Sequence, residues 1–251
     1  MYRIAEPSFF VKVLQLEWGY PDRRTAGATI YPMQEDSFTT RDVFSLKRLP
    51  SIISALVLLA SSYVAEHFAN VYAFDYSSRP TSTHVGDLIL DNIPVIDFNF
   101  IIIEFALISL VIGTLFVFYK PRYILFSLKA LALFIIIRAL FISLTHVGIH
   151  PENIAPGLGF FDSIYTYLNF QTGLFFSGHT GLPVLMAFIF WHNSRARLIF
   201  LVLAFVFGVA VLLAHIHYSI DVFAAPFMAY GIFKIAQHLF RRDYELIESA
   251  R

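Results

Sequence analysis

Residues 198–216 read LIFLVLAFVFGVAVLLAHI, an apolar run interrupted only by His215 near its end. A helix that crosses the hydrocarbon core of a bilayer needs about 20 mostly apolar residues, so this run predicts a membrane span. Five more windows have the same character: Leu49–Phe74, Phe98–Tyr119, Tyr123–Val147, Gly173–Trp191 and Val222–Phe240. We therefore expect an all-α, polytopic membrane protein with six transmembrane helices. The last window is the weakest, because Lys234 and His238 interrupt its final turns, where both can snorkel to the interface.

The composition excludes most soluble classes of protein. The 251-residue chain is 57% hydrophobic and only 14% charged, whereas a soluble domain has about 25% charged residues. Its 28 Phe and 13 Tyr are incompatible with intrinsic disorder. Because 18 basic and 18 acidic residues balance without a basic stretch, no nucleic-acid partner is expected. The absence of cysteine excludes disulfides, thiolate nucleophiles and cysteine metal sites.

The distribution of basic residues predicts the orientation of the chain, because Lys and Arg are retained on the cytoplasmic side. Sixteen of the 18 lie before the first span, around the loops that join spans two to three and four to five, or near and after the end of the last span. Arg79 lies on the opposite side, and Arg138 lies within the third span. Both termini are therefore predicted to be cytoplasmic, with outer connections at 75–97, 148–172 and 216–221.

The domain organisation follows from these spans. Residues 1–46 are expected to form a cytoplasmic arm, residues 47–241 a six-helix membrane domain, and residues 242–251 a cytoplasmic tail. The first 48 residues show no basic start followed by an apolar stretch and a cleavage site. The first span is therefore expected to act as the targeting signal.

Residues 214–222, AHIHYSIDV, contain the most informative polar groups of the chain. His217 and Asp221 are four residues apart, which places them on one face of a helix. A carboxylate bonded to one imidazole nitrogen fixes the tautomer and makes the other nitrogen more nucleophilic. The spacing fits equally well a buried pair that only ties two helices together. His215 and His217 would point apart on a helix, so metal binding is not expected.

A second polar stretch, Phe176-Ser177-Gly178-His179-Thr180-Gly181, lies near the start of the fourth span. Gly178 lets the backbone approach a ligand closely, and N–H groups at an outer helix end suit a phosphate. His179 could then act as a general acid. Taken alone, the stretch is explained more simply as a small-residue helix contact with an interfacial histidine.

The predicted topology brings the two stretches together, because spans four and five form a hairpin. His179, His217 and Asp221 would then meet at the outer interface, where one imidazole could attack phosphorus and the other protonate the leaving oxygen. Arg138 lies 15 residues into the third span, about 22 Å from its cytoplasmic start. Its guanidinium suits a bidentate phosphate contact; the alternative is a structural ion pair, for example with Glu104.

The paired motifs, Ser177–Thr180 (SGHT) and His217–Val222 (HYSIDV), resemble those of the sphingomyelin synthase family within the type 2 phosphatidic acid phosphatase superfamily. Asp87–Pro94 is similar to the family's acidic outer-loop motif, and Arg138–Thr145 to its arginine-bearing third span. The resemblance implies the six-helix fold of that superfamily. It also implies that residues 47–241 are a catalytic domain with an exoplasmic active site.

The resemblance further implies roles and substrates. His217 would take the phosphoryl headgroup as a phosphohistidine, Asp221 would orient it, and His179 would protonate the departing lipid alcohol. The donor would be a glycerophospholipid of the phosphocholine or phosphoethanolamine class and the acceptor a ceramide or diacylglycerol-like alcohol, without a metal or other cofactor. The phosphate or substrate contacts would come from Arg138, Ser177, Gly178 and Thr180.

Two alternative functions remain open. A lipid phosphate phosphatase would use the same catalytic residues with water as acceptor. The phosphatases of the superfamily carry a Lys…Arg-Pro motif and a Ser-Arg pair ahead of the last histidine, where this chain has Val211 and Leu212. That difference favours the transferase. A lipid-binding protein, scramblase or transporter would instead use Glu104 and Arg138 along a translocation path.

Overall fold

The computed structural model describes residues 38–77, 79, 82–145, 147–154 and 174–249. The chain divides into Met1–Ser37 and Phe38–Arg251, and everything described lies in the second unit. Its described α-helices are α2 (Thr40–Val43), α3 (Leu49–Ser77), α4 (Ala106–Tyr119), α5 (Ile124–Leu144), α7 (Gly178–Ile189), α8 (Ser194–Leu213), α9 (Ser219–Leu239) and α10 (Arg241–Glu248). The shorter turns are η1 (Leu46–Arg48), η2 (Leu90–Asn92), the π-helical η3 (Ile101–Phe105) and η4 (Pro121–Tyr123).

The prediction of an all-α, polytopic membrane protein is confirmed. Within the described ranges, five helical segments are long and apolar enough to cross a membrane, and they coincide with five of the six predicted windows. These segments are Leu46–Ser77, Ile101–Tyr119, Pro121–Leu144, Ser194–Leu213 and Ser219–Leu239. The remaining window, Gly173–Trp191, corresponds to α7, which is apolar but shorter.

The short α7 departs from the predicted window Gly173–Trp191. It has 12 residues, about 18 Å of helix, and Gly173 itself lies outside the described residues. Phe175 and Phe176 have φ angles of 131° and 26°, values that a helix does not contain. The helix therefore begins only after Ser177, whose hydroxyl accepts the N–H of Thr180 at 3.4 Å. The described apolar residues that precede α7 are irregular chain, in which Leu174 and Phe175 are partly buried and Phe176 is fully enclosed.

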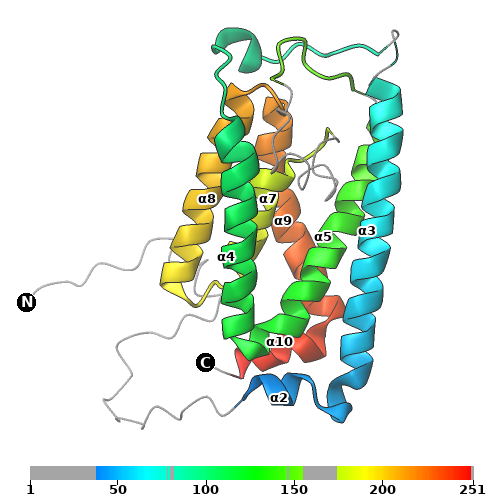
Figure 1. The fold of residues 1–251 in the computed structure, drawn as a ribbon, viewed down its shortest axis with the longest axis vertical. Helices are drawn as coiled ribbons and strands as arrows, with labels where there is room; N and C mark the ends of the chain where they lie inside the picture. Colours follow the sequence, from blue (N-terminus) through cyan, green and yellow to red (C-terminus); the bar gives the residue numbers. More distant parts are fainter. Residues whose placement is uncertain (1–37, 78, 80–81, 146, 155–173, 250–251) are drawn as a thin grey trace, which may run out of the picture. The chain divides into compact units, whose positions relative to one another are not determined.

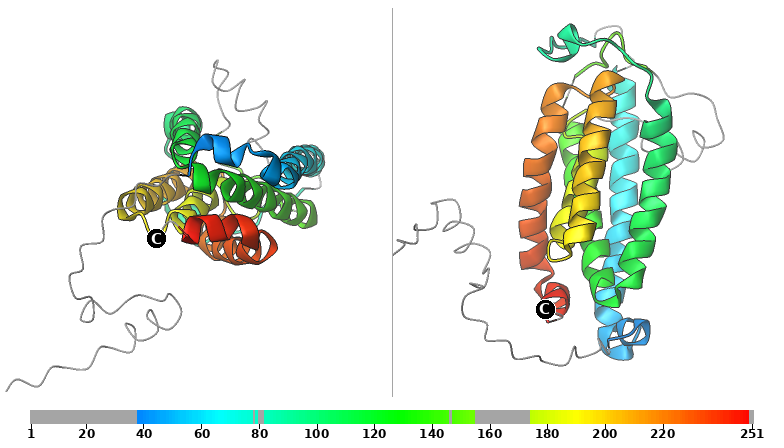
Figure 2. Two further views of the ribbon diagram at one scale, coloured as in Figure 1. Left: turned by 90° about the horizontal axis from the view of Figure 1, so that it is seen from below. Right: turned by 90° about the vertical axis from the view of Figure 1, so that its left-hand side faces the viewer.

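Helix α5 lies at the centre of the bundle, with α3 along one side and α9 and α7 on the other (Figures 1 and 2). Its buried side chains follow every face rather than one stripe, as expected for a helix surrounded by others. Phe126, Ala130 and Phe134 belong to the main apolar core. The side chains of Ser127, Lys129 and Arg138 are polar and buried on the same helix.

Among the described residues, the basic side chains predicted to be cytoplasmic gather at one end of the bundle. The guanidinium groups of Arg48 and Arg122 lie 5.2 and 5.1 Å from the ring centre of Phe38, and Arg122 donates to the Ser249 hydroxyl at 2.8 Å. Helix α10 lies across this end (Figure 1) and covers most of residues 242–251, the segment predicted as a cytoplasmic tail. The described parts of the predicted outer connections lie at the opposite end (Figure 1), and the cytoplasmic assignment of the basic end stays a prediction.

A closed polar triangle fastens α10 to the bundle. The Lys129 ammonium lies 2.6 Å from Oδ2 of Asp243 and donates to the Ser51 hydroxyl at 2.8 Å. The same hydroxyl donates to Oδ1 of Asp243 at 2.7 Å. The Lys129 and Asp243 side chains are only 7% and 6% exposed, so each charge depends on the other for compensation.

We expect Asp243→Ala to lower the free energy of unfolding by about 3–5 kcal/mol, because the Lys129 ammonium would stay buried without its counterion. Combining Lys129→Met with Asp243→Leu should recover most of this loss, since apolar replacement of a buried pair is often neutral. Thermal unfolding in detergent micelles measures both variants. Glu245→Ala, which breaks the exposed pair with Arg241 on the same helix, is the control and should cost less than about 1 kcal/mol. An equally small loss in Asp243→Ala would contradict the prediction.

Candidate active site

His217 and Asp221 form a hydrogen-bonded pair at the start of α9. Nδ1 of His217 lies 3.2 Å from Oδ2 of Asp221, and the same oxygen accepts the N–H of Tyr218 at 3.2 Å. The helix begins at Ser219, two residues later than a helical His217 would require. The pair still forms, because the Asp221 carboxylate turns back over the helix start as an N3 capping residue does. Both side chains are buried.

A tight turn between α8 and α9 presents His217. Helix α8 ends at Leu213, and His215 adopts a left-handed φ of 53° that reverses the chain. Such a residue commonly ends a helix. The N–H of Asp221 then donates to the Tyr218 carbonyl at 3.0 Å, which closes the first turn of α9. His217 is thereby held between two helix ends rather than within either helix.

His179 lies in the first turn of α7 and has a different partner. Its Nε2 lies 3.1 Å from the carbonyl oxygen of Ile102. Because a carbonyl oxygen can only accept, this contact places a hydrogen on Nε2. Ile102 belongs to the π-helical turn η3 and is fully buried. The carbonyl therefore fixes the orientation of the imidazole from the neighbouring span.

The two imidazoles face one another as the hairpin prediction required. Their ring centres are 6.4 Å apart, and the ring planes are inclined at 65°. The N–H of Ser177 donates to the Asp221 carbonyl at 2.9 Å, which ties the start of α7 to the first turn of α9. The structure thus brings together His179, His217 and Asp221, the three residues that the sequence singled out for catalysis.

Arg138 lies beside the start of α7, but its ion-pair partner differs from the alternative suggested by the sequence. Nη1 of Arg138 donates to Oε1 of Glu66 on α3, and both residues are buried; the suggestion of Glu104 as the partner was wrong. A Cβ atom on Gly178 would lie 3.4 Å from Nε of Arg138, so glycine permits this close approach. The sequence suggested only an interfacial polar role for Glu66, and its pairing with Arg138 was not predicted. The available signal was a second intramembrane charge in the outer half of a span.

The other two predicted substrate contacts have structural positions of their own. Ser177 is fully buried, and its hydroxyl caps α7. Thr180 is also buried, and a Cβ atom on Gly208 of α8 would lie 3.5 Å from its Oγ1. The roles of both residues in binding phosphate stay predictions.

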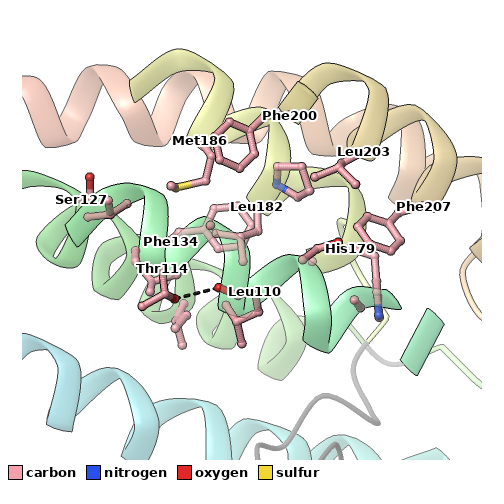
Figure 3. Close-up of a pocket in the computed structure, with 18 of the residues that line it drawn as sticks. Leu110, Thr114, Ser127, Phe134, His179, Leu182, Met186, Phe200, Leu203 and Phe207 are labelled. Carbon is pink, nitrogen blue, oxygen red and sulfur yellow. Dashed lines mark hydrogen bonds between the residues drawn. The ribbon is translucent and has the colours of Figure 1, made fainter. Parts of the chain in front are cut away.

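A cavity of about 300 Å³ opens between α4, α5, α7 and α8 (Figure 3). One end is lined by His179, Arg138 and Glu66, and the other end includes Ser127. From Arg138 to Ser127 the wall follows α5 for about 16 Å. Most of the remaining lining is apolar and includes Leu110, Phe134, Leu182, Met186, Leu203 and Phe207. The cavity therefore suits an extended hydrocarbon chain with a polar group near His179.

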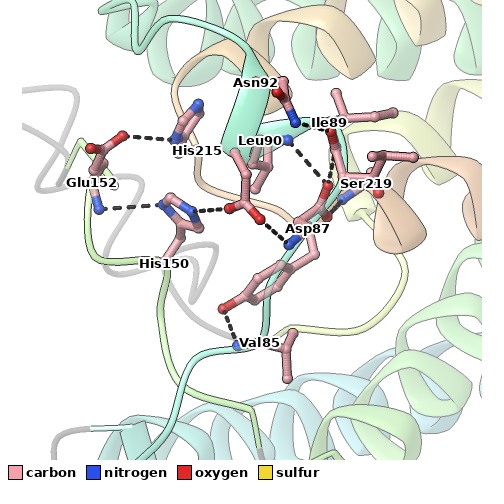
Figure 4. Close-up of polar contacts among 12 residues, drawn as sticks. Val85, Asp87, Ile89, Leu90, Asn92, His150, Glu152, His215 and Ser219 are labelled. Atoms are coloured by element: carbon pink, nitrogen blue, oxygen red, sulfur yellow. Dashed lines mark hydrogen bonds and ion pairs between the residues drawn. The ribbon is translucent and has the colours of Figure 1, made fainter.

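Histidine residues also gather in the outer layer above the α8–α9 turn. The buried ring of His215 lies perpendicular to that of His150 at 4.8 Å, and its Nδ1 is 3.9 Å from Oε2 of Glu152 (Figure 4). Burial lowers the pKa of His215, and the nearby His150 lowers it further. His215 is therefore neutral in the folded protein at neutral pH.

Residues 172–239 match the family described as PAP2 superfamily C-terminal. This range contains both motifs and runs through α7, α8 and α9, so it includes His179, His217 and Asp221. No match to the chain was found among curated proteins. The predicted likeness to the type 2 phosphatidic acid phosphatase superfamily, which comprises lipid phosphate phosphatases and transferases, is confirmed for this segment. Membership of the sphingomyelin synthase family stays a prediction.

The lowered pKa of His215 predicts a stability that declines in acid. Below about pH 6.5 the unfolded chain binds a proton at this position that the folded protein resists, so the free energy of unfolding falls as pH falls. His215→Asn removes the titrating group but keeps a residue type that tolerates a left-handed φ. It should flatten the decline of the thermal midpoint between about pH 7 and pH 5.

The control is His67→Asn, at an exposed position of α3. It should leave the pH dependence of the thermal midpoint unchanged. An equally steep decline in His215→Asn would assign the effect to the groups around it, namely His150, Glu152 and Asp87.

Proposed function

We propose that this protein is an integral-membrane phosphotransferase of the sphingomyelin synthase type. It moves a phosphoryl headgroup, of the phosphocholine or phosphoethanolamine class, from a glycerophospholipid to a lipid alcohol such as ceramide. The observation that carries the proposal is the pair of facing imidazoles, whose ring centres are 6.4 Å apart and of which His179 lines the polar end of an apolar cavity. The match of this segment to a lipid-phosphate superfamily supports the same chemistry.

The partners of the two histidines support different roles. His217 bonds to the Asp221 carboxylate, which stabilises the positive charge that develops on the ring as Nε2 attacks phosphorus. His179 bonds to a neutral carbonyl, which stabilises an imidazolium less and leaves it a better proton donor. His217 is accordingly the nucleophile, and Nδ1 of His179 is the atom that transfers the proton.

The separation of the rings suits one phosphoryl group between them. A near-attack geometry places the nucleophile about 3–3.5 Å from phosphorus. A general acid must lie within about 2.6–3.2 Å of the leaving oxygen. A centre-to-centre distance of 6.4 Å keeps both rings within reach of one phosphoryl group.

The reaction proceeds by two displacements at phosphorus. In the first, the His217 nitrogen forms a bond to phosphorus, the bond to the diacylglycerol oxygen breaks, and that oxygen takes the proton of His179. In the second, the acceptor hydroxyl gives its proton to His179, and its oxygen forms a bond to phosphorus. The phosphorus–nitrogen bond then breaks, and its electron pair returns to His217. The headgroup has changed its lipid, and both imidazoles are restored.

Two further features support a lipid acceptor. The cavity can hold a hydrocarbon chain with the headgroup beside His179, and the Arg138 guanidinium, a group suited to phosphate oxygens, lines the same end. Val211 and Leu212 occupy the last turn of α8, and Val211 is fully buried. The cationic grip of the phosphatases therefore has no counterpart at this position, which favours transfer over hydrolysis.

We expect the purified protein to form a new phospholipid only when donor and acceptor are both present. The assay supplies phosphatidylcholine or phosphatidylethanolamine with and without a fluorescent ceramide in mixed micelles, and product is separated by chromatography. Ceramide-dependent product together with diacylglycerol supports the transferase. Release of inorganic phosphate from phosphatidic acid, without any ceramide-dependent product, would identify the phosphatase instead.

We expect His217→Ala to abolish turnover, since it removes the nucleophile. Asp221→Asn and His179→Ala should each lower kcat by about 10²–10⁴-fold, because one loses the orienting carboxylate and the other the general acid. The rate should follow a bell-shaped pH profile, since one imidazole must be neutral and the other protonated.

His238→Ala, at an exposed site near the far end of α9, is the matched control and should keep full activity. Acid-labile phosphate bound to the protein should be trapped with the unaltered chain and lost in His217→Ala. Full activity in His217→Ala would reject the chemistry and favour lipid transport through the same cavity.

A further inference from the structure

Asp87 connects the outer loop to the start of α9. Its Oδ2 accepts the N–H of Ser219 at 2.7 Å, across 132 residues of sequence. Its Oδ1 accepts the N–H groups of Ile89 and Leu90 at 2.9 and 3.1 Å. Figure 4 shows this carboxylate between its own loop and α9. Asp87 is 7% exposed, so these bonds are made out of contact with bulk water.

Two carboxylates thus hold two consecutive amides at the start of α9. Asp221 accepts from Tyr218, and Asp87 accepts from Ser219. The first N–H groups of a helix have no partner within the helix. Because Asp87 supplies the acceptor for Ser219, the Asp221 carboxylate can remain on Tyr218 and on Nδ1 of His217.

Other contacts hold Asp87 and the turn in place. Oδ2 of Asp91 accepts the N–H of Asp87 at 2.9 Å. The Tyr218 hydroxyl donates to the Gly148 carbonyl at 2.9 Å and accepts the N–H of Val85 at 3.4 Å. The loop that carries Asp87 is therefore fixed to the start of α9 through both Tyr218 and Ser219. Burial alone would raise the pKa of Asp87, but the N–H groups of Ser219, Leu90 and Ile89 outweigh it and lower that pKa.

We propose that Asp87 is a positioning residue for the reaction, which fixes the first turn of α9 through the Ser219 N–H and thereby keeps Asp221 on His217. The inference rests on the proposed function, because it takes His217 as the nucleophile. Asp87 is not among the residues that line the cavity within the described chain. It therefore acts on the rate of the chemical step and not on the binding of the lipid chain.

Asp87→Asn is the sharpest test, because asparagine has one acceptor oxygen where aspartate has two. The amide can satisfy either its own loop or Ser219, but it presents N–H donors to the other. We expect kcat to fall by up to about 10²-fold, as for a small misplacement of a catalytic group, while KM stays unchanged. The substrate is whichever of phosphatidylcholine, phosphatidylethanolamine and phosphatidic acid the unaltered protein turns over.

Asp91→Asn is the matched control. It removes the same charge from the same loop, but its amide oxygen can still accept the N–H of Asp87. Its kcat should stay within about twofold of the unaltered protein. An equal loss of kcat in Asp91→Asn would assign the effect to loop charge and overturn the proposal. If Asp87→Asn lowered the thermal midpoint but left kcat unchanged, Asp87 would be only a structural cap. That result would also overturn the proposal.

A spectroscopic readout tests the inference without turnover. Nitrogen-15 histidine spectra of the protein in nanodiscs report the hydrogen bond at Nδ1 of His217, with the signal assigned by its loss in His217→Ala. Asp87→Asn should weaken this signal, and Asp91→Asn should not. An unchanged signal in Asp87→Asn overturns the inference. Retained activity in His217→Ala is a different result, since it removes the proposed function itself.

Discussion

One oxygen of Asp221 accepts two hydrogen bonds, from the backbone of Tyr218 and from the imidazole of His217. The main-chain carbonyl of the same residue accepts from Ser177 at the start of α7. Asp221 therefore caps the first turn of α9, orients the imidazole of His217 and positions α7, which carries His179. In a water-poor environment such bonds strengthen, and leaving any of these groups unpaired costs more than in water. The facing geometry of the two histidines follows from this constraint.

Helix α5 carries two buried basic residues, and each forms an ion pair at a different end of the bundle. Arg138 pairs with Glu66 near the imidazoles, and Lys129 pairs with Asp243 under α10. Among the described residues, the first pair lines the cavity and the second does not. Charges within a membrane domain are tolerated when they are paired or functional. The second pair anchors helices, whereas the first holds a guanidinium beside the start of α7, where the proposed function needs a phosphate contact.

The sequence predicted most of the fold, because apolar runs of sufficient length are the direct requirement for crossing a bilayer. It also predicted that His179 and His217 lie on the same side, because the two outer ends of a helical hairpin lie at one interface. The late start of α7 was not predictable, because positive φ angles at Phe175 and Phe176 arise from tertiary packing rather than composition. The partners of Arg138 and Ser219, namely Glu66 and Asp87, were missed for a related reason. Both contacts join segments far apart in the chain, and spacing reports only local geometry.

The shortness of α7 bears on whether a lipid alcohol or water would act as the acceptor. Arg197 donates to the carbonyl of Trp191 just beyond one end of α7, and residues of these types mark a membrane interface. A helix of about 18 Å is shorter than a hydrocarbon layer of about 30 Å, so a layer that begins at Trp191 would extend roughly 12 Å beyond His179 at the other end of α7. Bulk water is depleted at that depth, whereas an amphiphile diffusing laterally in the leaflet arrives there without leaving its solvent. For the proposed transferase, such a recess would enrich a membrane-borne hydroxyl over H₂O before any bond is made.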